Sequence, residues 1–266
     1  MGLMITTFAS AADFNRATRV LDREGLPYQA LPLPEGFEWL ASPGLMMDVE
    51  TRAALVDALG DSLHSSGWVD YRPAKEVPQH PEAETSGEDI FGGAALTLLT
   101  PCVADETKVR IIAEITGNLE PVMPYLNALM PHASYSPGAQ TLTYLDGHRM
   151  VVLYPQRIAM AKPDELVDAW LRLADIRARA NDAWARRGEI EPDYTTRKKP
   201  PALEILKWLP GTNCGQCGEM TCMAFALRLW AGEARLGACS PVLVPEQAAH
   251  FEALREICAG LGAPLT

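Results

Sequence analysis

The sequence has no apolar run of about eighteen residues, so we expect no membrane span. Its N-terminus lacks a basic start followed by a long apolar core, which argues against a secretion signal and favours a cytoplasmic protein. The G-x-S-x-G, Walker and H-E-x-x-H motifs of common enzyme classes are missing as well. These absences favour a protein with no substrate site of its own over an enzyme.

Positive charge is scarce in the first part of the chain. Residues 1–107 contain 6 Lys and Arg against 17 Asp and Glu, whereas residues 108–266 contain 17 of each sign. The net charge of −11 therefore falls on the first part, which would repel phosphates and argues against a nucleic-acid partner. An acidic surface of this kind either steers a basic partner protein or is simply solvated.

Four of the six cysteines gather within residues 209–240. Cys214, Cys217 and Cys222 have the spacing C-x2-C-x4-C, and Cys239 follows with sixteen residues between. Glycines between the first three allow tight turns and let backbone N–H groups approach a bound sulfide. A [4Fe–4S] cluster takes four thiolate ligands, so this pattern favours such a cluster.

Three other interpretations of the cysteines fit the sequence less well than a cluster does. Structural zinc usually takes two separated ligand pairs, whereas here three cysteines crowd together and no histidine lies between Cys214 and Cys239. Disulfides are rare in cytosolic proteins. Unliganded core cysteines fit poorly in a glycine-rich loop. Cys102 and Cys258, outside the pattern, are expected to be ordinary small apolar residues.

The segment LPGTNCGQCGEMTCMAFA and the lone cysteine after it resemble the four-cysteine [4Fe–4S] module of the corrinoid iron–sulfur protein of the acetyl-CoA pathway. The module is also similar to one in the electron-entry subunit of Rnf-type complexes and in stand-alone iron–sulfur proteins of anaerobes. The resemblance implies that Cys214, Cys217, Cys222 and Cys239 bind the cluster. It covers about forty residues and leaves the work of the whole protein open.

The first seventy residues follow a strand and helix order of their own. Strands are expected near residues 3–8, 27–34, 44–49 and 68–71, with helices between, which is the βαββαβ order of a ferredoxin-like unit. The unit is similar to selenium/sulfur carrier-like domains in its first strand and helix, its PLP turn and its GLMMDV strand. Those domains carry Cys-Gly before the third strand, but this chain has Pro43-Gly44, so the carrier thiol is missing.

The whole chain is predicted to be α+β, with two ferredoxin-like α/β sandwich units followed by a small helical [4Fe–4S] module. Residues 73–107 read as an acidic linker with an apolar patch at 92–102, which we interpret as a docking strand or short helix. The expected divisions are 1–72, the linker 73–107, an α+β domain 108–190, a second linker 191–202, the module 203–245 and a C-terminal helix 246–266.

Three functions fit this organisation. The first is electron transfer to a protein redox partner, either an anaerobic metalloenzyme or a corrinoid protein. The second is an accessory role in assembling or reactivating a metallocofactor. The third is an interaction scaffold in which the cluster is only structural. A set of four cysteine ligands leaves no iron open to substrate, which favours the first.

Overall fold

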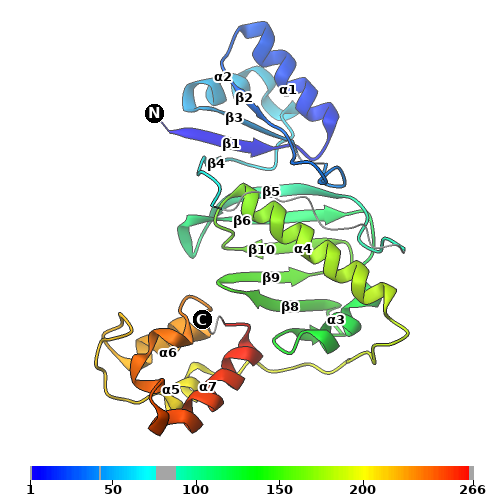
Figure 1. Cartoon of the computed structure of the whole chain (residues 1–266). Helices are drawn as coiled ribbons and strands as arrows, with labels where there is room; N and C mark the ends of the chain where they lie inside the picture. Colours follow the sequence, from blue (N-terminus) through cyan, green and yellow to red (C-terminus); the bar gives the residue numbers. More distant parts are fainter. Residues whose placement is uncertain (1, 42, 76–87, 264–266) are drawn as a thin grey trace. The chain divides into compact units, whose positions relative to one another are not determined.

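The computed structural model describes residues 2–41, 43–75 and 88–263, and its fold is α+β (Figure 1). The chain divides into two compact units. Unit 1 comprises Met1–Pro121 and Leu153–Arg186, and unit 2 comprises Val122–Val152 and Arg187–Thr266. Within the described residues, no helix is both long and apolar enough to cross a membrane.

Unit 1 begins with a four-stranded antiparallel sheet in the order β2-β3-β1-β4. Two helices cover one face of this sheet and bury an apolar cluster that includes Phe8, Leu21 and Leu55 (Figure 1). Ser10 caps the first helix, and Gly25 ends it in the left-handed conformation, as their residue types predict. The elements are β1 (Leu3–Thr7), α1 (Ala11–Glu24), β2 (Gln29–Leu31), β3 (Gly44–Asp48), α2 (Val49–Leu59) and β4 (Val69–Asp70).

The rest of unit 1 holds three further antiparallel strands and the longest helix. Strands β5 (Ala94–Cys102), β6 (Asp105–Ile115) and β10 (Arg157–Ala161) lie side by side in that order, and α4 (Leu166–Ala185) belongs to the same unit (Figure 1). Composition predicts a linker over 73–107, but β5 within it pairs with β6 along its length, because the apolar residues of β5 fill a sheet face. The expected linker residues 76–87 lie outside the described residues.

Two acidic residues fix the start of α4. The carboxylate of Asp164 forms ion pairs with Lys108 and Lys75, and Glu165 caps the helix by accepting from the backbone N–H groups of Val167 and Asp168. Burial alone would raise the pKa of Asp164, but the two lysines outweigh it and hold that pKa well below its usual range. The carboxylate of Asp164 therefore stays charged, and its ion pairs stabilise unit 1.

Unit 2 contains strands that lie in the order β9-β8-β7, followed by the C-terminal helices. The chain from 94 to 185 runs ββαββββα. The expected hairpin joins β8 and β9, but its two turn residues are Gly147 and His148, and Asp146 is the last residue of β8. The elements are α3 (Met123–Leu129), β7 (Ser134–Ser136), β8 (Thr141–Asp146), β9 (Arg149–Leu153), α5 (Ala202–Trp208), α6 (Cys222–Trp230) and α7 (Ala248–Leu261).

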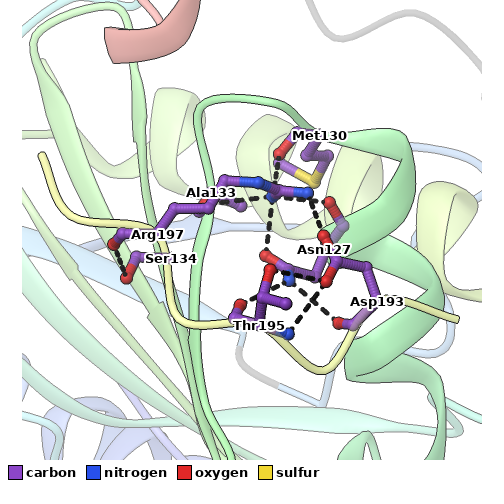
Figure 2. A network of polar contacts seen from close by, with 7 residues as sticks. All are labelled: Asn127, Met130, Ala133, Ser134, Asp193, Thr195 and Arg197. Atoms are coloured by element: carbon purple, nitrogen blue, oxygen red, sulfur yellow. Dashed lines mark hydrogen bonds and ion pairs between the residues drawn. The ribbon is translucent and has the colours of Figure 1, made fainter.

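The segment 193–199, which we call the strap, was expected to be part of a flexible linker. Instead, Figure 2 shows the guanidinium of Arg197 held by α3 and the turn after it. Its Nη1 donates to the backbone oxygen of Asn127 at 2.7 Å and to the side-chain oxygen of Asn127 at 2.8 Å. Its Nη2 pairs with Asp193, while the Asn127 amide donates to the carbonyls of Asp193 and Thr195 at 2.9 and 3.0 Å.

The strap also reaches the C-terminal helices. The amine of Lys199 donates to the carbonyl of Trp230 at the end of α6 at 2.8 Å and lies 3.6 Å from the centre of its indole ring. The Trp230 ring N–H in turn donates to the carbonyl of Pro200. A Cβ placed on Gly232 would clash with the carbonyl of Gly147 in the β8–β9 turn, so α6 ends close against that turn. The strap and the β8–β9 turn together attach the C-terminal helices to strands β7–β9.

Candidate metal centre

The four cysteines singled out by the sequence line one hollow in unit 2. Cys214 and Cys217 lie in the loop between α5 and α6, Cys222 is the first residue of α6, and Cys239 follows a short 3-10 helix over Leu236–Ala238. Cys214 is exposed and Cys239 is buried, with Cys217 and Cys222 in between. The hollow therefore opens to the surface on the loop side and closes against the core on the Cys239 side.

The loop takes its shape from residues with positive φ. Gly215 and Gly218 have φ of 74° and 86°, and the N–H of Gly218 donates to the carbonyl of Gly215 at 3.0 Å. Asn213 also has a positive φ of 50°, which asparagine tolerates better than most residues. These turns bend the loop so that Cys214 and Cys217 both reach the hollow. The glycines satisfy a backbone requirement here, because a Cβ on Gly215 or Gly218 would meet no atom within 4 Å.

The N-terminus of α6 is fixed by two side-chain caps. The Oγ1 of Thr221 accepts from the backbone N–H of Ala224 at 3.0 Å, and the Oδ1 of Asn213 accepts from the N–H of Cys222 at 2.8 Å. Cys222 thus sits where the helix dipole favours a negative charge. The capping role of Asn213 was not predicted from the sequence. Its signal is an asparagine just before the first cysteine, because asparagine suits both positive φ and capping.

Apolar side chains close the inner side of the hollow. Phe225 lines it directly, and Leu229, Leu236 and Val242 belong to the buried cluster behind it. Cys217 and Cys222 pack against the same cluster, which α5 and α7 complete. This core keeps water from one side of any group bound by the thiols, while the glycine loop leaves the other side near solvent.

The pKa values of Cys214 and Cys239 are shifted in opposite directions. Hydrogen bonds from the backbone of Gln216 and the side chain of Thr212 hold the pKa of Cys214 below its usual value. Burial raises the pKa of Cys239, and negative charge on the other three cysteines raises it further. A cation among these thiols would remove this repulsion, and binding it would release their protons. The electrostatics thus suit a positively charged centre shared by all four.

The donor set suits an iron–sulfur cluster. In a cluster the thiolates bind different iron atoms, so they surround a volume and need not meet at a point. Four cysteines round one hollow, on a glycine-rich loop and a helix N-terminus, meet this requirement. Thiolates are also the soft ligands that iron–sulfur clusters use.

The two remaining cysteines lie elsewhere and are buried. Cys102 is on β5 in unit 1, and Cys258 is on α7 within the core behind the hollow. Burial raises the pKa of Cys258 to about 11, so its thiol stays protonated. Both behave as the small apolar residues expected from the sequence.

Comparison with known proteins agrees with this thiolate site. Residues 209–241 match a family model described as "Putative Fe-S cluster". The chain therefore carries an iron–sulfur cluster domain at this end, and an iron–sulfur cofactor is supported.

Three relatives match over the same end of the chain. The acetyl-CoA decarbonylase/synthase complex subunit gamma of Methanosarcina acetivorans is 51% identical over 41 residues, which is 15% of this chain and 9% of that protein. Subunit gamma 2 of the same complex from Methanosarcina thermophila is 42% identical over 69 residues, covering 23% and 15%. The corrinoid/iron-sulfur protein large subunit of Moorella thermoacetica is 57% identical over 37 residues, covering 14% and 8%.

The match thus spans at most 15% of the length of these three relatives, so the likeness concerns the cluster domain alone. No solved structure matches the chain.

Proposed function

We propose that Cys214, Cys217, Cys222 and Cys239 bind one [4Fe–4S] cluster and that the protein transfers electrons to a protein partner. The partner would be an anaerobic metalloenzyme or a corrinoid protein. The observation that carries the proposal is the convergence of these four cysteines, and no other cysteine of the described residues, on one hollow. The match to an iron–sulfur family over the same residues supports it.

Each part of the site has a separate task in this proposal. The four thiolates hold the group, and the caps on α6 fix the orientation of Cys222. Phe225 and the buried cluster behind it exclude water from the inner side. When bound, a [4Fe–4S] cluster supplies a reversible one-electron couple whose potential depends on exposure and on hydrogen bonds to sulfur.

The outer side of the site supports exchange with another protein. Cys214 is exposed, and the side chain of Met220 in the same loop is 89% exposed. Glu219 is the one charged residue within 209–221, and its carboxylate is paired with Arg228. An exposed methionine beside a cofactor gives an adaptable apolar contact for a partner surface. The N-terminal carrier-like sheet, which lacks the carrier thiol, would serve in docking.

The test is to purify the full chain without oxygen and to measure iron, sulfide and zinc together with EPR spectra. We expect about four iron and four sulfide per chain and a signal that appears on reduction. Replacing any one of the four cysteines by serine should remove most of the iron. The matched control is Cys102→Ser, which changes a cysteine that does not line the hollow and should leave the iron content unchanged.

The outcomes separate the candidate functions. Iron-free protein loaded with zinc would refute the cluster itself. A cluster that cannot be reduced reversibly within the biological range of potentials would refute electron transfer and favour a structural role. A cluster that is reduced reversibly and reoxidised by a partner protein would support the proposal.

A further inference from the structure

A second cavity in unit 2 lies apart from the cysteines. Its walls come from the turn before β7, from β8 and β9, from the strap and from the end of α7. Its volume is about 130 Å³. None of the residues that line it lines the hollow of the four cysteines. It is therefore a separate candidate site, and its occupant does not depend on the proposed cluster.

The cavity has an apolar floor and a positive rim. Ala133, Tyr144 and Leu261 are buried at its floor. Of the described residues that line it, three are cations, from Arg197 to Lys199, and none is acidic. In a chain with a net charge of −11, this is a local concentration of the opposite sign. Such a site favours an anion that also has apolar surface.

Among the described residues, two of the three cations already have partners. Arg197 is held by α3 and Asp193, and the amine of Lys199 donates to the carbonyl of Trp230. Lys198 is exposed and forms no hydrogen bond or ion pair with another of the described residues. A single free amine matches a single negative charge.

The size of the cavity limits the apolar part of the ligand. An apolar cavity of about 150 Å³ accepts benzene, so about 130 Å³ holds one ring or a branched chain of similar bulk. The ring of His132 lies edge-on to that of Tyr144, with 6.0 Å between their centres, and both line the cavity. Aromatic walls favour a planar aromatic guest.

We propose that this cavity binds a small aromatic monocarboxylate, with the ring between the apolar walls and the carboxylate beside Lys198. Benzoate is the probe, and saturation-transfer NMR on the full anaerobic protein measures its binding. We expect saturable binding with a Kd of about 1 mM, since few atoms make contact. Benzamide, which has the same shape without the charge, and acetate, which lacks the ring, should both bind more weakly.

Two variants test the geometry. Lys198→Gln should weaken benzoate binding about two- to fivefold at low salt, the range of an exposed ion pair. Arg255→Gln is the matched control, because it removes one exposed positive charge on α7 outside the cavity and should change nothing. Gly260→Phe adds a ring where a Cβ has no neighbour within 4 Å, and it should abolish binding by filling the cavity.

Three results would overturn the proposal. One is wild-type protein that shows no saturable binding of benzoate. Another is Lys198→Gln and Arg255→Gln binding benzoate equally well. The third is a folded Gly260→Phe variant, judged by circular dichroism, that binds benzoate like the wild type. Should Gly260→Phe fail to fold, the comparison of the two charge variants decides alone. Because iron content is measured separately, a failure here is distinct from a failure of the cluster.

Discussion

Replacing Arg197 by methionine tests whether the strap is held in place or free. Methionine keeps much of the length and the apolar stem of arginine but removes the guanidinium. Arg197→Lys keeps the charge but cannot form the same fork of hydrogen bonds. In both variants the strap should open more often, because the carbonyl of Asn127 and the carboxylate of Asp193 lose their shared donor.

The size of the effect follows from the number of bonds that are lost. Nη1 lies near four oxygens, at 2.7, 2.8, 3.1 and 3.3 Å, but it carries only two hydrogens. Only the two short contacts, both to Asn127, count as full bonds. With the ion pair to Asp193, three interactions are lost, each of about 1 kcal/mol because the arginine is 31% exposed. The free energy of local opening should fall by about 2–3 kcal/mol.

Hydrogen exchange measured by mass spectrometry on peptides covering 190–200 gives this free energy directly. The backbone N–H of Asp193 donates to the carbonyl of Pro124 in α3 at 3.0 Å, so this amide reports opening of the strap. In Arg197→Met it should exchange about 30- to 150-fold faster than in the wild type. Arg255→Met, at an exposed pair on α7, should leave it unchanged. Equal and fast exchange in all proteins would show that the strap is a free linker and would refute this reasoning.

Three further predictions concern single positions. Asn213→Ala should cost about 2–3 kcal/mol of local stability, because alanine is strained at this positive φ and cannot cap the N–H of Cys222. A faster loss of iron to a chelator would reveal this loss of stability. Gly232→Ala should lower the melting temperature by several degrees, because the new Cβ has no room beside the carbonyl of Gly147. Calorimetry measures this change, and Gly138→Ala is the control because a Cβ there meets open space.

The third prediction concerns pH. The folded-state pKa of Asp164 is depressed, so its ion pairs stabilise unit 1 above the unfolded pKa of about 4, and this stability is lost as the pH falls below that value. Urea unfolding of Asp164→Asn should show a loss of about 1–2 kcal/mol at pH 7 that shrinks towards pH 3, and a constant loss would contradict it.

The cysteine site could be anticipated from the sequence because its information is local. Three of the four cysteines lie within nine residues, and the glycines and Pro210-Gly211 around them predict a loop. Cys222 is the first residue of α6, and Thr221, one of the residue types that favour a helix start, supplies the cap. The role of Asn213 was missed, because its bond to Cys222 joins residues that meet only once the loop is folded.

The linkers and the second sheet could not be read in the same way. Composition made 73–107 resemble a spacer, but the hydrophobic alternation of β5 is satisfied by β6, a partner that local pattern does not identify. The strap is polar and contains three consecutive cations, which suggested a solvated linker. Its order depends on Asn127, seventy residues earlier than Arg197, whose buried amide is satisfied only by strap atoms. Non-local hydrogen bonds of this kind leave no periodic signal.

The attachment of the helical end to β7–β9 changes how electron transfer would work. A cluster on a loose tether would reach its partner by swinging, and its rate would depend on linker length. Here the strap holds Trp230 through Lys199, and Gly232 lies against Gly147, so the site moves with the sheet of unit 2. An electron-transfer partner would therefore have to come to the exposed loop around Met220. The rate of transfer should then rise with the concentration of that partner.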